Sequence, residues 1–150
     1  MAGWRLAFAA GNEQMIEALN LIQDHLFVGI FPALQEAGIA ALLDPKSEEA
    51  VAQLNAVYDS RRDAFVQAAA KIGWQAFPSR GSFYAWMPVP EGYTSESFAD
   101  LLLEKVHVAV APGKGFGPAG DAYVRIGLLV EPERLVEAVN RIADLHLFNN

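Results

Sequence analysis

The chain has 150 residues, of which 53% are hydrophobic and 19% charged, so it can bury the core of one domain and lacks the composition of a disordered chain. With a net charge of −7 and no membrane-length apolar stretch free of charge or proline, we expect neither a nucleic-acid partner nor a membrane-spanning segment. The absence of cysteine excludes disulfides and thiol chemistry and fits a cytoplasmic protein.

The beginning of the chain predicts one strand followed by two helices. Residues 4–10 form a short apolar run that is typical of a buried strand. Asn12 can cap a helix that starts at Glu13, and residues 33–43 predict a second helix. A lone buried strand leaves its backbone groups unpaired, so residues 4–10 need neighbouring strands from elsewhere.

The longest predicted helix covers residues 47–72. Ser47 caps it, apolar residues recur along one stripe, and Gly73 closes it in the position that favours a left-handed backbone. At 1.5 Å per residue it would be roughly 39 Å long. Because this is long for a domain of this size, we expect it to lie along a domain boundary.

The rest of the chain predicts a small sheet with helices. The predicted strands are residues 74–77, 82–87, 106–111 and 123–130, and the predicted helices are residues 95–105 and a final one that begins at Pro132. This order is typical of an α+β (α/β) domain in which helices cover a small sheet.

Metal and hydrolase chemistry find little support in the residues. The three histidines, His25, His107 and His146, have no partner at metal-ligand spacing, so we expect no metal site. Ser82 does not lie in a GxSxG motif and has no nearby base.

Residues 112–120, PGKGFGPAG, form a glycine-rich loop. Gly115 to Gly120 formally matches GxGxxG, but the loop leads into a strand and not a helix, and Pro118 removes one N–H. The loop is therefore not expected to bind a dinucleotide. Two interpretations are left: a connection with positive φ at several glycines, or a loop that lets the backbone approach a ligand closely.

Two arginines stand in apolar segments. Strand alternation places Arg125 on one face with Tyr123 and Gly127, opposite Val124 and Ile126. Either that face is solvated, or it lines a cleft in which the guanidinium binds an anion such as a carboxylate. Arg5 presents the same alternatives, because it could also be an ordinary arginine at the end of a strand.

Three motifs resemble one family. MAGWRLAFAAGN resembles the segment after the cofactor lysine in class I/II aminotransferases, the fold-type I enzymes that use pyridoxal 5′-phosphate, whose pattern is S-K-x-x-x-M-A-G-W-R-x-G-F. GSFYAWMPVP resembles the family's G-x-F-Y-x-W strand. VAVAPGKGFGPAGDAYVRIGLLV resembles its C-terminal signature, V-x-V-x-P-G-x-x-F-G-x-x-G-x-x-Y-x-R-I.

The resemblance covers nearly the whole chain and implies a C-terminal portion of such an enzyme. Residues 1–45 would be the end of the large domain, with one stray strand, and the interdomain segment. Residues 46–150 would be the small C-terminal domain, with a mostly antiparallel sheet. Arg5 matches the arginine that contacts the cofactor phosphate, and Arg125 matches the arginine that binds the substrate α-carboxylate.

The resemblance also implies that the Schiff-base lysine precedes Met1. None of the four lysines, Lys46, Lys71, Lys105 and Lys114, matches the catalytic position, so the chain alone is expected to be inactive and not to bind the cofactor. The parent is expected to be a homodimer, or otherwise self-associated, that transfers an amino group between an amino acid and a 2-keto acid. A faint likeness over residues 20–43 suggests a methionine-type keto acid.

Two alternatives stay open. The chain could be a stand-alone, non-catalytic module that keeps the fold for binding or assembly. The parent could also be a pyridoxal phosphate-dependent C–S lyase or decarboxylase, because some relatives of the same fold catalyse those reactions.

Overall fold

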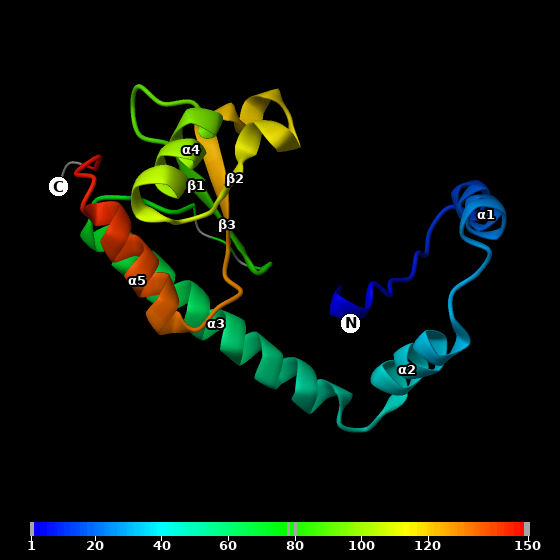
Figure 1. Cartoon of the computed structure of the whole chain (residues 1–150). Coiled ribbons are helices and arrows are strands. Elements are labelled where there is room, and N and C mark those ends of the chain that lie inside the picture. Colours follow the sequence, from blue (N-terminus) through cyan, green and yellow to red (C-terminus); the bar gives the residue numbers. More distant parts are fainter. Residues whose placement is uncertain (1, 78, 80, 149–150) are drawn as a thin grey trace. The chain divides into compact units, whose positions relative to one another are not determined.

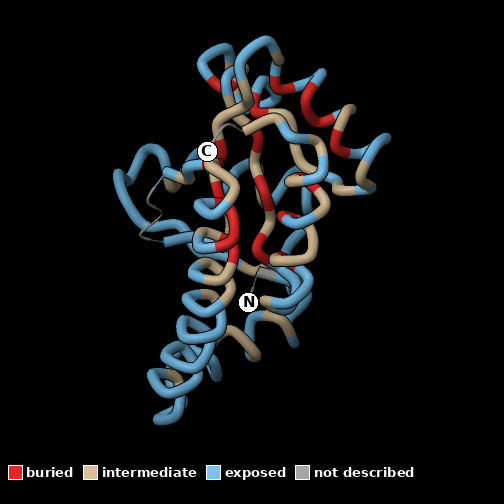
Figure 2. Tube along the Cα trace, turned by 90° about the vertical axis from the view of Figure 1, so that its left-hand side faces the viewer, coloured by how far each residue is buried: buried red, intermediate tan, exposed pale blue. Residues whose placement is uncertain are grey.

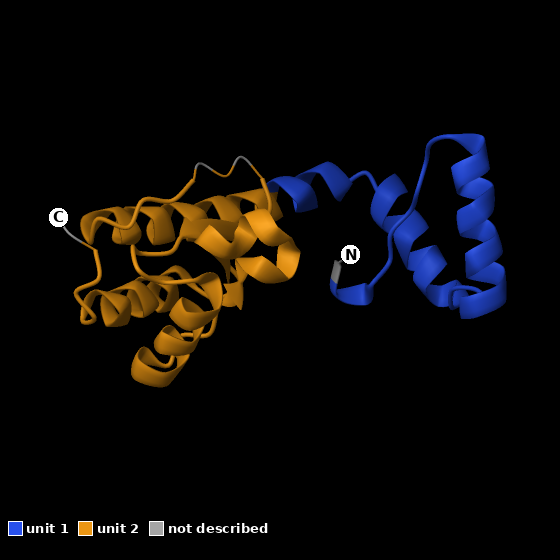
Figure 3. Ribbon diagram, turned by 90° about the horizontal axis from the view of Figure 1, so that it is seen from above, with its two compact units in different colours: residues 1–52 blue, residues 53–150 orange. Residues whose placement is uncertain are grey.

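The computed structural model describes residues 2–77, 79 and 81–148, which form two compact units. Unit 1 comprises Met1–Ala52 and unit 2 comprises Gln53–Asn150 (Figure 3). The boundary between the units falls inside the long helix α3 (Ser47–Lys71). This helix confirms the one predicted at residues 47–72. Gly73, with φ +80°, follows its end as predicted.

Unit 1 consists mainly of helices. It contains the short 3-10 helix η1 (Ala2–Trp4), helix α1 (Glu13–Ile22), the π-helical turn η2 (Gln23–Phe27) and helix α2 (Pro32–Leu43). The side-chain oxygen of Asn12 accepts a hydrogen bond from the backbone N–H of Met15 at 3.3 Å, which confirms the predicted cap. Among the described residues of unit 1, none is buried.

The strand predicted at residues 4–10 is wrong. Trp4 ends η1, Arg5 has a positive φ of 56°, and the residues that follow are in neither helix nor strand. Trp4 is 65% exposed and Phe8 83% exposed. The described part of the chain provides no strand to pair with this segment, and an extended segment without a partner gains no ladder hydrogen bonds.

Unit 2 contains the sheet, which has three antiparallel strands in the order β1-β3-β2 (Figure 1). The strands are β1 (Tyr84–Pro88), β2 (Ala111–Pro112) and β3 (Tyr123–Gly127). The helices of this unit are the second part of α3, α4 (Ser95–Val106) and α5 (Pro132–Ala143). These elements confirm the predicted α+β domain with a small antiparallel sheet and helices.

One of the four predicted strands of this unit is absent, one is observed only at its last residue, and two are shifted or shorter. Residues 74–77 form no strand: the backbone N–H of Trp74 donates to the Ala69 carbonyl at the end of α3 at 3.0 Å, and its ring lies in the core with Nε1 donating to the Pro88 carbonyl at 2.7 Å. Of the strand predicted at residues 106–111, only the last residue is in a strand: Val106 ends α4, His107 caps it with φ +56°, and β2 starts at Ala111. The strands predicted at residues 82–87 and 123–130 are observed as β1 and the shorter β3.

The core of unit 2 lies between one face of the sheet and the helices. Strand positions alternate between buried and half-buried, and the buried side chains of β1 and β3 are Ala85, Met87, Val124 and Ile126. They pack with buried residues of the helices, drawn in red in Figure 2, which include Phe65, Ala69, Phe98, Leu102, Leu135, Val139 and Ile142. The opposite face of the sheet is therefore left for the half-buried side chains. No described helix is both long enough and apolar enough to cross a membrane.

Candidate functional site

Arg125 lies in the middle of the central strand, β3. Its neighbours Val124 and Ile126 are buried in the core, whereas Arg125 is half-buried on the other face. This confirms the predicted alternation. In the ladder, Arg125 pairs with Trp86 of β1 on one side and with Ala111 of β2 on the other, so strands flank it on both sides.

The guanidinium of Arg125 is held by aromatic rings. Its Cζ lies 4.1 Å from the ring centroid of Tyr84 and 4.2 Å from that of Phe116. Within the described residues, no carboxylate forms an ion pair with it. Because ring faces attract a cation without accepting its N–H groups along the edge, the planar fork of donors stays available for an anion.

Further aromatic side chains surround the two rings. Trp86 stacks on Tyr123, with centroids 5.6 Å apart and planes inclined by 25°. Trp86 also meets Phe116 edge to face, with a centroid distance of 5.8 Å. This face of the sheet therefore combines apolar surface with the Arg125 cation, which has no ion-pair partner among the described residues. The combination suits a small ligand that has a carboxylate and an apolar part.

The glycine-rich loop carries Phe116 to this face. It forms two short 3-10 helices, η3 (Gly113–Phe116) and η4 (Pro118–Ala122). The expectation of positive φ at several glycines is wrong, because among the loop's glycines only Gly117 has one, at +125°. Gly113 and Gly120 are glycine for a different reason: a Cβ on either would overlap the carbonyl oxygen of the other. The close backbone approach that these glycines allow is therefore between two parts of the loop, Gly113 and Gly120.

Both ends of this loop are fastened to the start of α4. Ser95 is fully buried, and its Oγ donates to Asp121 Oδ1 at 2.9 Å and accepts from the backbone N–H of Lys114 at 3.2 Å. Lys114 Nζ forms an exposed ion pair with Glu96 Oε2 at 2.7 Å, and this hydrogen bond raises the pKa of Lys114. Sequence reasoning missed Ser95 and Asp121, whose contact joins segments far apart in the chain.

The two buried glycines of the loop provide a direct test of this packing. Gly120→Ala is expected to lower the free energy of unfolding by about 1–3 kcal/mol, because the new methyl group can be accommodated only by moving the Gly113 backbone. Gly115→Ala is the matched control: a Cβ there meets nothing within 4 Å, so a change of less than about 0.5 kcal/mol is expected. Urea denaturation of the purified variants measures both. Equal stability of the two variants would contradict this reading of the loop.

Arg5 lies in unit 1 and Arg125 in unit 2. The contacts of Arg5 with the cofactor phosphate and of Arg125 with the substrate carboxylate stay predictions. Arg5 is exposed, and within the described residues it has no ion pair or hydrogen-bond partner. Its guanidinium is therefore uncommitted, and its donors fit an oxyanion such as a phosphate. The described residues contain no group of three or more His, Asp or Glu side chains that could hold a metal ion.

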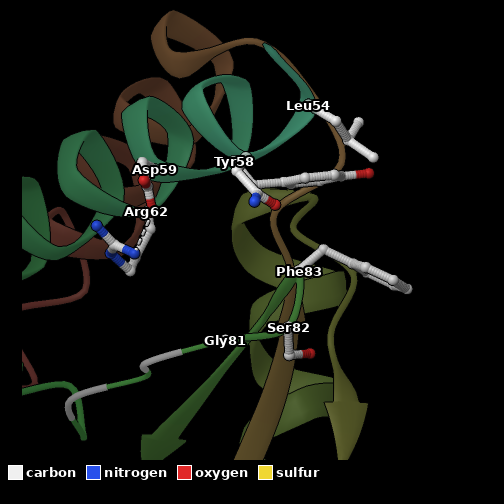
Figure 4. A pocket seen from close by; sticks show the side chains of 8 residues that line it. Leu54, Tyr58, Asp59, Arg62, Gly81, Ser82 and Phe83 are labelled. Atoms are coloured by element: carbon white, nitrogen blue, oxygen red, sulfur yellow. Dashed lines mark hydrogen bonds and ion pairs between the residues drawn. The ribbon is translucent and has the colours of Figure 1, made fainter. Parts of the chain in front are cut away.

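A cavity of about 430 Å³ lies elsewhere in unit 2 (Figure 4). It is lined by Leu54, Tyr58, Asp59 and Arg62 of α3 and by Ser82 and Phe83 before β1. Arg62 is already paired there, with Asp63 at 2.8 Å and Asp59 at 2.5 Å, and these hydrogen bonds raise its pKa. Its charge is neutralised by the two carboxylates, so this cavity is a poorer anion site than the face around Arg125.

Comparison with known proteins identifies the family. The model of the family described as "Aminotransferase class I and II" matches residues 1–142, which is most of the chain. The chain belongs to the class I and II aminotransferase family. This confirms the resemblance of the three sequence motifs, and pyridoxal 5′-phosphate is the expected cofactor of a member of the family.

Individual aminotransferases are similar over nearly all of the chain but only part of their own length. L-glutamine–4-(methylsulfanyl)-2-oxobutanoate aminotransferase of Bacillus subtilis (strain 168) is 58% identical over 99% of this chain and 37% of its own. LL-diaminopimelate aminotransferase of Moorella thermoacetica is 45% identical over 95% of this chain and 36% of its own length. The solved structure of apo-BacF from Bacillus subtilis has a TM-score of 0.88 at 44% identity, and the match covers 100% of this chain and 38% of that structure's chain. The chain thus spans little more than a third of these aminotransferases.

Proposed function

We propose that this chain supplies the substrate-carboxylate site of a pyridoxal phosphate-dependent aminotransferase. Such an enzyme moves an amino group between an amino acid and a 2-keto acid. The observation that carries the proposal is the Arg125 guanidinium, which lies over two aromatic rings on the central strand and has no carboxylate partner among the described residues. Both substrates have a carboxylate next to the reacting carbon, and a bidentate arginine fixes that group in position and orientation.

The uncommitted guanidinium of Arg5 fits the cofactor phosphate, so we assign Arg5 to that contact. When bound, the cofactor would supply electron-withdrawing chemistry at the substrate Cα, and the chain's own residues would bind and orient the substrate and the cofactor. In this proposal residues 1–45 belong with the large domain and residues 46–150 form the small domain. The whole protein would act in the cytoplasm, with which a sequence without cysteine is compatible.

A methionine-type keto acid is the substrate we favour for the whole protein. The support is the 58% identity to an aminotransferase whose name specifies 4-(methylsulfanyl)-2-oxobutanoate. The apolar surroundings of Arg125, with Trp86 and Phe116, agree with a substrate that has an apolar side chain.

Turnover assays on the whole protein test this function. The assays pair 4-(methylsulfanyl)-2-oxobutanoate with a panel of amino donors, including glutamine, aspartate and aromatic amino acids, and quantify the new amino acid and keto acid. Amino-group transfer supports the proposal. Release of a thiol or of carbon dioxide would favour a lyase or a decarboxylase, and the absence of turnover would favour a non-catalytic module.

The isolated chain provides a second comparison. Its four lysines, Lys46, Lys71, Lys105 and Lys114, do not match the family's catalytic lysine, so we expect it to be inactive on its own. Turnover by the isolated chain, with borohydride fixing the cofactor on one of these lysines, would contradict that expectation.

Unit 1 is the reason to expect self-association, as in a homodimer. Its large apolar side chains are exposed, among them Trp4, Phe8, Leu26, Phe27, Val28 and Phe31. Exposed apolar surface promotes association, so the sedimentation coefficient of the chain should rise with concentration. Replacing Val28 and Phe31 by serine should weaken this rise, whereas a monomer at every concentration would contradict the prediction.

A further inference from the structure

Arg125 is held by two residues that reach it from different parts of unit 2. Tyr84 belongs to the neighbouring strand β1, where it pairs with Gly127 and so lies two positions along the strand from Trp86, which is opposite Arg125. Phe116 ends η3 in the glycine-rich loop. The Cζ atom of Arg125 is 4.1 Å from one ring centroid and 4.2 Å from the other.

Holding an arginine with rings differs from holding it with a carboxylate. A carboxylate would occupy the fork of N–H donors, and a substrate anion would then have to compete with it. A ring attracts the cation through its electron-rich face and leaves the donors along the guanidinium edge free. Two rings over one guanidinium also limit its rotation, so less conformational entropy is lost when the anion binds.

Both rings are themselves supported. Phe116 meets the Trp86 ring at a centroid distance of 5.8 Å, and its loop is fastened to α4 through Ser95. The ring of Tyr84 packs against that of Phe83, with a centroid distance of 4.5 Å. The pair Tyr84 and Phe116, named here the aromatic clamp, is therefore anchored by strand β1 and by the fastened loop.

We propose that the aromatic clamp is a positioning device for substrate recognition, in which Tyr84 and Phe116 hold the Arg125 guanidinium with its donor edge directed to the substrate α-carboxylate. The clamp sets how strongly the enzyme prefers a carboxylate over a neutral group at that position. This inference rests on the proposed function of Arg125.

The test uses the whole protein and the preferred amino donor from the turnover panel, together with the α-carboxamide of the same amino acid. The quantity measured is the ratio of kcat/KM for the acid to kcat/KM for the amide. In Tyr84→Leu and in Phe116→Leu we expect KM for the acid to rise about tenfold and the ratio to fall by a similar factor. The kcat for the acid should change less than KM, because the clamp acts on binding.

Two variants serve as controls. Tyr84→Phe keeps the ring face and loses only the hydroxyl, so it should retain the wild-type ratio. Leu103→Ala removes an exposed apolar side chain of α4, and it should also retain the ratio. A variant that merely folded poorly would lower the active fraction and therefore kcat, and would leave KM and the ratio unchanged. Since Phe116 is 54% exposed, its replacement leaves the core intact.

The outcomes separate the clamp from the function on which it rests. If Arg125→Ala abolishes the preference for the acid while both leucine variants keep it, the clamp is overturned and the carboxylate site stands. If Arg125→Ala itself keeps the preference, both the site and the clamp are overturned. The clamp is supported if the acid-to-amide ratio of kcat/KM falls in both leucine variants and is retained in Tyr84→Phe.

Discussion

Replacing Arg125 by alanine in the whole protein is expected to lower kcat/KM for the amino donor by about 30-fold to 5,000-fold, since removing one partner of a desolvated charge pair costs about 2–5 kcal/mol. The half-buried guanidinium has no carboxylate partner within the described residues, so its removal leaves no unpaired acid behind. The free energy of unfolding should therefore change far less than the activity.

Arg125→Lys is the informative companion to this variant. Lysine keeps the positive charge but has a single ammonium in place of the planar fork, and it cannot lie over the rings of Tyr84 and Phe116 in the same way. We expect most of the loss seen with alanine to persist. Steady-state kinetics with the acid and thermal unfolding of the same preparations measure the two effects. Full activity of the lysine variant would show that charge alone suffices, against bidentate recognition.

Trp74→Ala is expected to lower the free energy of unfolding by about 3–5 kcal/mol, the range for removing a buried aromatic side chain. Trp74 is only 1% exposed, and its ring packs against three others, with centroid distances of 6.3 Å to Phe65, 5.9 Å to Phe98 and 5.0 Å to Phe148. These belong to α3, α4 and the segment after α5. The substitution therefore leaves a cavity where the helices of unit 2 meet.

The same indole also fastens the end of the sheet. Its Nε1 donates to the carbonyl oxygen of Pro88, the last residue of β1, at 2.7 Å. Trp74→Phe keeps most of the apolar volume but leaves that carbonyl without its donor, so a smaller loss of about 1–3 kcal/mol is expected. Urea denaturation followed by circular dichroism distinguishes the two. Phe77→Ala, at an exposed ring, should change the free energy of unfolding by less than about 1 kcal/mol. If Trp74→Ala lost no more stability than Phe77→Ala, the central place of Trp74 in the core would be contradicted.

Loss of packing at Trp74 should also reach the candidate site. Pro88 pairs with Tyr123 in the ladder, and the ring of Tyr123 stacks on Trp86 beside Arg125. The core that stabilises unit 2 and the aromatic face that surrounds Arg125 are thus the two faces of the same three strands.

Local signals in the sequence determined the helices and the alternation of the central strand. The Asn12 cap, the glycine after α3 and Pro132 at the start of α5 act through hydrogen bonds and backbone angles of nearby residues, so they can be read from the sequence directly. Alternation likewise separated Arg125 from Val124 and Ile126, because side chains of a strand point to opposite faces whatever its partners are. The three motifs sufficed to indicate the family.

Only the tertiary structure decided which extended segments pair and what surrounds Arg125. Residues 74–77 have the composition of a strand, but the backbone N–H of Trp74 donates to the Ala69 carbonyl at the end of α3, and residues 4–10 find no partner strand in the described chain. The sequence left Arg125 undecided between solvent and a cleft, because the rings that hold it come from a neighbouring strand and a loop. Contacts of that kind depend on how distant segments pack, and no local pattern of residues encodes them.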